Sequence, residues 1–239
     1  MGRKHYYLLT ALPSLMQFGS APPLGKSEFL TMVRDSGGPG SAVEVLLLGD
    51  DLLEREAVLS GEINLDEVDL SVLSAAQASG ARPLPEFLIA RGPQDEKVSR
   101  EVLSVDILWG RYFHYAANMA DRLGSRFLGD WVAYEVGLRN ALARERAATL
   151  GLDARPYLVA EELGNPGAVF HRELEAWKRA PDPLAGLEAL ERVRWQWLEE
   201  QTPWYDFGDD EVLAYGAKLL SLLRWRRILR DEHGEKGVS

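Results

Sequence analysis

The chain has 239 residues, 46% hydrophobic and 27% charged, which is the ordinary range of a globular protein and excludes disorder of the whole chain. It contains no cysteine, so disulfides, thiolate nucleophiles and cysteine-based zinc sites are excluded. The formal net charge of −10 argues against a nucleic-acid-binding surface, because such surfaces are usually basic.

The N-terminal 26 residues predict an extended arm or short strand followed by a loop, because Pro13, Pro22 and Pro23 prevent a continuous helix. Basic residues precede an early apolar run and superficially match a signal peptide, but Pro13 breaks that run. No stretch elsewhere approaches the roughly 18 apolar residues that a membrane-spanning helix needs. The sequence therefore favours a cytoplasmic protein that does not span a membrane.

Short helices are predicted over the next part of the chain. Ser27 is expected to cap a helix over 28–34, and the glycine-rich residues 36–40 form a loop. Three more are expected between residues 42 and 91. Asp50 or Asp51 caps the first, over 52–59, and Gly61 ends it. The second starts at Asp66 and ends near Gly80, and the third, over 84–90, has Pro83 in its first turn.

An acidic stretch overlaps these helices. Nine acidic residues lie between Glu44 and Asp69 against one base, Arg55, so the stretch has a net charge of −8. The stretch predicts either a solvated acidic face or a docking patch for a basic partner.

Gly92-Pro93 is the best candidate domain boundary. It divides an N-terminal arm and short-helix region, 1–92, from a bundle of long helices, 93–239. Apolar residues recur at helical spacing after the boundary, and Gly124-Ser125 either separates two helices or bends one. The remaining expected features are a helix stop at Gly151, a helix over 171–179, a helix capped by Asp182 to 201, and one capped by Asp209 to 232. The predicted fold class is all-α: an irregular helical N-terminal region followed by a long-helix bundle.

One segment of the bundle carries an unusual mixture of side chains. Trp131, Glu135, Leu138 and Arg139 fall near one face of a helix, and Glu135 and Arg139 are spaced as an i,i+4 ion pair. The pair is either a partly buried polar junction between helices or a simple surface pair. The spacing predicts that Trp131 and Leu138 are buried.

The last predicted helix is rich in bases, namely Lys218, Arg224, Arg226, Arg227 and Arg230. Cations near a helix C-terminus interact favourably with the helix dipole, which explains much of this run. The alternative is a binding surface for an acidic partner.

Motifs that carry chemistry are missing from the sequence. His171 and Glu175 lie one turn apart and could share a metal, but no HExxH pattern supports this, and an ordinary surface pair is the simpler interpretation. The glycines form no nucleotide-binding pattern. We therefore predict no catalytic, cofactor-binding or metal-ligating residues.

Three stretches together resemble an uncharacterised bacterial family whose genes lie among those of V-type ATPases. They are 6–15, 214–225, and the helix 127–150 with Trp131, Glu135, Leu138, Arg139 and Asn140. That family in turn is similar to a shortened form of the V-type ATPase C subunit, which is called d in eukaryotes. The C subunit is an all-helical funnel of three similar lobes that sits on the membrane rotor ring and receives the central stalk, and its chains are longer than this one.

The resemblance implies a fold and a function. The lobes of the C subunit carry an acidic, amide and arginine helix that resembles Glu135, Arg139 and Asn140 here. The implied role is a non-enzymatic component or assembly factor of a bacterial V-type ATPase. It would need no cofactor and no nucleic acid, its partners would be the central stalk and rotor ring, and it would lie in the cytoplasm at the inner face of the membrane. The alternatives are an enzyme with an unfamiliar helical active site and a stand-alone helical adaptor.

Overall fold

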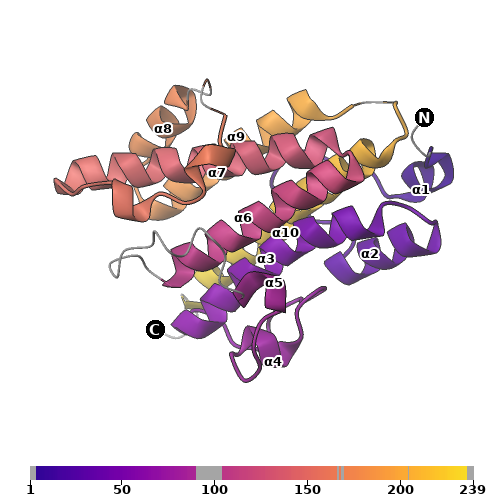
Figure 1. The fold of residues 1–239 in the computed structure, drawn as a ribbon, viewed down its shortest axis with the longest axis horizontal. Helices are drawn as coiled ribbons and strands as arrows, with labels where there is room; N and C mark the ends of the chain where they lie inside the picture. Colours follow the sequence, from indigo (N-terminus) through magenta and orange to yellow (C-terminus); the bar gives the residue numbers. More distant parts are fainter. Residues whose placement is uncertain (1–3, 90–103, 166, 168–169, 204, 236–239) are drawn as a thin grey trace. The chain divides into compact units, whose positions relative to one another are not determined.

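The computed structural model describes residues 4–89, 104–165, 167, 170–203 and 205–235. Every regular element in these residues is a helix, so the predicted all-α fold class is confirmed (Figure 1). Within the described ranges, no helix is both long enough and apolar enough to cross a membrane.

The helices pack as two compact units. The first unit contains residues 1–81 and 180–239, and the second contains residues 82–179. This grouping differs from the predicted division into 1–92 and 93–239, because the last two helices of the chain pack in the first unit. The proposed boundary at Gly92-Pro93 lies outside the described residues.

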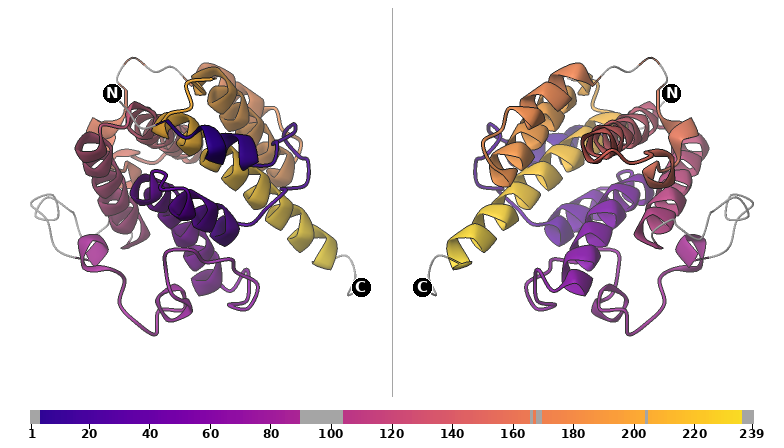
Figure 2. Two further views of the ribbon diagram at one scale, coloured as in Figure 1. Left: turned by 90° about the vertical axis from the view of Figure 1, so that its right-hand side faces the viewer. Right: turned by 90° about the vertical axis from the view of Figure 1, so that its left-hand side faces the viewer.

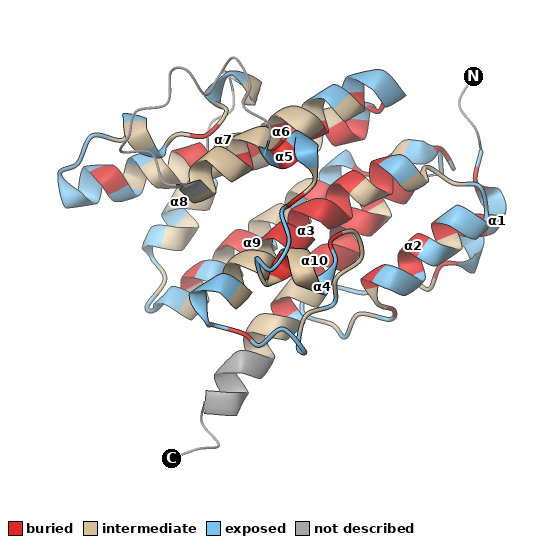
Figure 3. Ribbon diagram, turned by 60° about the horizontal axis from the view of Figure 1, so that its bottom comes forward, coloured by how far each residue is buried: buried red, intermediate tan, exposed pale blue. Residues whose placement is uncertain are grey.

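The first unit is built around two long helices, Gly40–Ser60 and Asp209–Glu235, which pack against each other. Its elements are α1 (Tyr6–Ala11), α2 (Lys26–Asp35), α3 (Gly40–Ser60), α4 (Ala75–Ala78), α9 (Pro183–Gln201) and α10 (Asp209–Glu235). α10 packs against both α3 and α9, and α2 packs against α3 (Figures 1 and 2). Most of the middle of α3 is buried, because its apolar residues continue around the helix instead of following one stripe (Figure 3).

Two predictions for the start of this unit were wrong. The expected extended arm is a short helix, α1, which buries Leu8 and ends before Pro13. The helix expected to follow a Ser27 cap begins earlier, at Lys26, with Gly25 at the N-cap and no side-chain cap. Its first residue is almost wholly buried, which a capping argument from sequence cannot anticipate.

Of the short helices predicted between residues 42 and 91, the one over 84–90 corresponds in part to a short helix over Glu86–Ile89, but the first two begin elsewhere. Asp50 and Asp51 do not begin a helix but lie in the middle of α3, which ends as predicted at Gly61 in the left-handed conformation, φ 79°. Asp66 lies in a turn, and the next α-helix, α4, begins only after Ser74, which forms a capping box with Gln77.

The second unit follows its sequence signals more closely. Its elements are α5 (Glu86–Ile89), α6 (Ser104–Leu123), α7 (Arg126–Leu150), the 3-10 helices η2 (Arg155–Tyr157) and η3 (Glu161–Leu163), and α8 (His171–Lys178). Gly124 and Ser125 separate α6 from α7, with Gly124 at φ 65° and the Ser125 hydroxyl accepting a hydrogen bond from the Leu128 N–H. Gly151 ends α7 at φ 67°, as predicted.

Aromatic and aliphatic side chains fill the interior of the second unit. On α6, Trp109, Tyr112 and Phe113 are each 5% exposed and contact one another. On α7, a Cβ atom at Gly137 would lie 2.7 Å from the ring of Phe170, so glycine allows this close approach. The unit is therefore held mainly by apolar packing.

A buried charge network as the candidate functional site

α3 carries three acidic side chains into the interior of the first unit. Asp50, Asp51 and Glu54 are 2%, 0% and 3% exposed. Asp50 and Glu54 are one helical turn apart and share a face, whereas Asp51 is rotated away from them. Burying an isolated carboxylate is very costly, so each of these groups needs partners.

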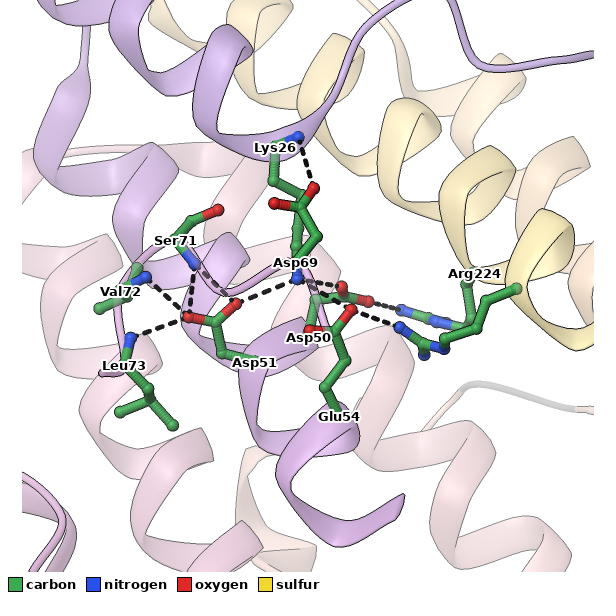
Figure 4. Close-up of polar contacts among 10 residues, drawn as sticks. Lys26, Asp50, Asp51, Glu54, Asp69, Ser71, Val72, Leu73 and Arg224 are labelled. Carbon is green, nitrogen blue, oxygen red and sulfur yellow. Dashed lines mark hydrogen bonds and ion pairs between the residues drawn. The ribbon is translucent and has the colours of Figure 1, made fainter. Parts of the chain in front are cut away.

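Lys26 provides the common partner. Its ammonium nitrogen lies 2.8 Å from Asp50 Oδ2, 3.1 Å from Asp51 Oδ1 and 3.2 Å from Glu54 Oε1. Lys26 is the first residue of α2 and is only 1% exposed, and its backbone N–H donates to Asp69 Oδ2 at 3.3 Å (Figure 4). The start of α2 is thereby fixed against the middle of α3.

Asp51 also binds the backbone of the loop before α4. Its carboxylate accepts hydrogen bonds from the N–H groups of Ser71, Val72 and Leu73, at 3.0, 2.7 and 2.9 Å to Oδ2 (Figure 4). Three consecutive N–H groups that point at one carboxylate form an anion-binding concavity. These N–H groups are therefore committed to Asp51, so no helix runs through residues 71–73, and the helix predicted from Asp66 to near Gly80 is reduced to α4.

Two arginines of α10 complete the network. Arg227 Nη1 donates to Glu54 Oε1 at 2.5 Å, and Arg224 Nη2 lies 3.6 Å from Asp50 Oδ1. Arg224 Nη1 also donates to Glu191 of α9 at 3.1 Å. The last helix is thus tied to both α3 and α9 by charged contacts.

Glu191 is the fourth buried carboxylate of the network. It is 4% exposed and accepts hydrogen bonds from Arg194 Nη1 at 2.9 Å and from the Ser221 hydroxyl at 3.1 Å. Four carboxylates therefore face four cations, which are Asp50, Asp51, Glu54 and Glu191 against Lys26, Arg194, Arg224 and Arg227. The network is electrically balanced when all of its members are ionised.

The electrostatic environment keeps most of these groups charged. Burial lowers the pKa of Lys26, but the charges of Asp50, Asp51 and Glu54 outweigh burial and raise that pKa above its usual value. Burial raises the pKa of Asp50, but Lys26, Arg224 and Arg227 lower it further than burial raises it. The ammonium and this carboxylate are therefore held as an ion pair.

The other two perturbed carboxylates differ from each other. Burial raises the pKa of Glu191, but Arg224 and Arg194 outweigh this and lower it. For Glu54 the effect of burial prevails, so its pKa is raised despite the contacts with Lys26 and Arg227. Glu54 is therefore the acid of the network that the fold most readily protonates.

The chemistry that this arrangement supports is electrostatic positioning. An ammonium occupies the space among the carboxylates of α3, so a metal ion placed there would meet a like charge. Within the described ranges, no group of three or more histidine, aspartate or glutamate side chains could hold a metal ion. Removing one partner of a buried ion pair is strongly destabilising, so the network fixes the register of α2, α3, α9 and α10.

The predicted basic helix and the predicted acidic stretch thus meet each other. Arg224 and Arg227 bind the acids of α3 and α9, while Lys218 is 2.7 Å from Glu199 Oε1 and lies over the ring of Trp195. Arg226 is exposed. The interpretation of the acidic stretch as a solvated acidic face was wrong for three of its nine acids, which are buried and pair with cations of the same chain.

One of the residues predicted on α7, Arg139, forms a separate polar junction within the second unit. Arg139 Nη2 lies 3.1 Å from Asp106 Oδ1 of α6, and its guanidinium lies over the Trp109 ring at 5.2 Å. Leu138 is wholly buried as predicted, whereas Trp131 is only partly buried. Glu135 is also partly buried. Arg139 thus joins α7 to α6 through Asp106, an acid that local spacing does not indicate, whereas the predicted junction paired Arg139 with Glu135 of the same helix.

Asn140 has a structural role on the same helix. Its side-chain amide donates to the Val159 carbonyl at 2.9 Å, and its side-chain oxygen accepts from the Val159 N–H at 2.8 Å. Asn140 is 2% exposed, so this pairing satisfies a buried amide and ties the chain after α7 to the helix. Of the weak metal candidates, His171 is exposed and Glu175 pairs with Arg179.

Sequence reasoning missed the centre of the charge network, which is Lys26, Asp50, Asp51 and Glu54. The available signal was the segment Leu48-Gly49-Asp50-Asp51-Leu52, in which leucines continue on both sides of two acids without a proline. Acids enclosed by an uninterrupted apolar helix indicate buried charge and hence a distant cation. The identity of that cation does not follow from local spacing.

Comparison of the chain with models of protein families, with curated proteins and with solved structures finds no match.

Proposed function

We propose that this protein is a non-enzymatic component or assembly factor of a bacterial V-type ATPase, acting by contact where the central stalk meets the membrane rotor. The proposal rests on the resemblance of three stretches to the family encoded with V-type ATPase genes and, through that family, to the C subunit. In this role the protein lies in the cytoplasm at the inner face of the membrane.

One structural observation supports treating two of these stretches as a single motif. The Tyr215 hydroxyl, in the stretch 214–225, donates to the carbonyl of Pro13, in the stretch 6–15, at 2.8 Å. Leu15 packs against the buried cluster that includes Trp225. Two of the stretches that carry the resemblance, about 200 residues apart in sequence, therefore contact each other within the first unit.

The charge network supports a role that is not catalytic. Its carboxylates and Lys26 are almost wholly buried and contact one another, so they do not present a reactive group to a substrate. A catalytic site places its titratable groups in a cleft that a substrate enters. A set of helices held together by internal charges instead suits a protein that works by binding.

Purification of the native complex tests the proposal. The chain carries an affinity tag at its chromosomal locus, membranes are solubilised in mild detergent, and bound proteins are quantified by mass spectrometry. We expect V-type ATPase subunits in constant ratio to the tagged chain, and we expect tagged ATPase to recover this chain in return. Recovery of ATPase subunits only at the level of an untagged control would overturn the proposal, as would a constant ratio to some other partner.

A further inference from the structure

We draw no further inference here: the strongest candidate, the apolar surface of α1 at the start of the first unit, where Tyr6 and Tyr7 are 53% and 92% exposed, carries no proposal because nothing in the structure shows what covers it.

Discussion

The two units bury polar side chains in opposite ways. Among the described residues, every buried charged side chain belongs to the first unit, whereas the buried polar residues of the second unit are Ser125 and Asn140. Both of these are neutral: Ser125 bonds to a backbone group three residues away and Asn140 to backbone groups 19 residues away. In the first unit, by contrast, Lys26 meets acids more than twenty residues away, and Arg227 meets Glu54 across 173 residues.

This difference determines which contacts each unit needs in order to fold. Neutral hydroxyls and amides satisfy buried backbone groups at low cost, and their partners in the second unit lie at most 19 residues away in sequence. Buried charges are tolerated only when all partners arrive together, so they make the first unit depend on the meeting of the two chain ends. Substitutions in each unit, and the dependence of stability on pH, test this contrast.

The largest effect is expected from Lys26→Met. Methionine has a similar volume but leaves Asp50, Asp51 and Glu54 buried without their common cation, which should cost about 3–5 kcal/mol of unfolding free energy. Urea denaturation followed by circular dichroism measures this loss. The control is Arg34→Met, since Arg34 pairs with Glu44 on the surface and its loss should cost less than about 1 kcal/mol. Equal losses in the two variants would refute the special status of Lys26.

Leu138→Ala should produce an effect of similar size in the second unit by a different mechanism. Leu138 is wholly buried, so the substitution leaves a cavity and should destabilise by about 2–5 kcal/mol. Leu150, at the end of the same helix, is 70% exposed, and Leu150→Ala should change stability by less than about 0.5 kcal/mol. If Leu138→Ala proves as mild as Leu150→Ala in urea denaturation, apolar packing does not dominate this unit.

Arg139→Ala probes the polar junction of the second unit and should cost about 1–2 kcal/mol. The expected loss of stability is smaller than for Lys26→Met. The side chains of Arg139 and Asp106 are 33% and 11% exposed, so water replaces part of the lost contact. The Trp109 ring also loses its cation. A thermal or urea denaturation that shows a change below about 0.5 kcal/mol would place the pair with ordinary surface ion pairs.

The smallest effect concerns pH and separates two acids of the network. Cations lower the pKa of Asp50 despite its burial, so its contribution is complete above its unfolded pKa of 3.8 and is lost as pH falls through the lower folded pKa. Burial raises the pKa of Glu54, so its contribution is present below its unfolded pKa of 4.5 and is lost as pH rises through the higher folded pKa. The two carboxyls oppose each other.

Glu54→Gln removes the carboxyl whose contribution to stability is lost as pH rises. The stability of the variant should therefore rise more steeply with pH, from the acid range upward past pH 4.5, than that of the unmodified chain. Urea midpoints measured across this range test the slope. An unchanged or shallower slope would mean that Glu54 is not the acid that the fold tends to protonate.

The same contrast explains what could be predicted from the sequence. The end of α7 follows from Gly151 and the start of α9 from Asp182, because capping is local, whereas Gly124-Ser125 left open whether two helices or one bent helix would form. Asp50 and Asp51 have the same residue type as a cap but lie inside a helix, since distant cations bind them. Local spacing cannot distinguish these cases.

The sequence indicates the two sides of the candidate site separately. Arg224 and Arg227 belong to a basic run and the acids of α3 to an acidic stretch, but no local pattern predicts that the two pair. Lys26 carried no signal at all, because a lysine at the start of a helix is normally solvated. Their meeting is a property of the tertiary fold, which brings α2, α3 and α10 together.

A double-mutant cycle with Lys26→Met and Asp51→Asn tests most directly whether the first unit is organised around its buried cation. Urea denaturation gives the unfolding free energies of the unmodified chain, both single variants and the double variant. The contact of 3.1 Å between the two groups predicts strong coupling, so the double variant should be more stable than the sum of the two losses implies, by about 1 kcal/mol or more. Losses that add to within about 0.3–0.5 kcal/mol would show that the groups act independently and would contradict the account.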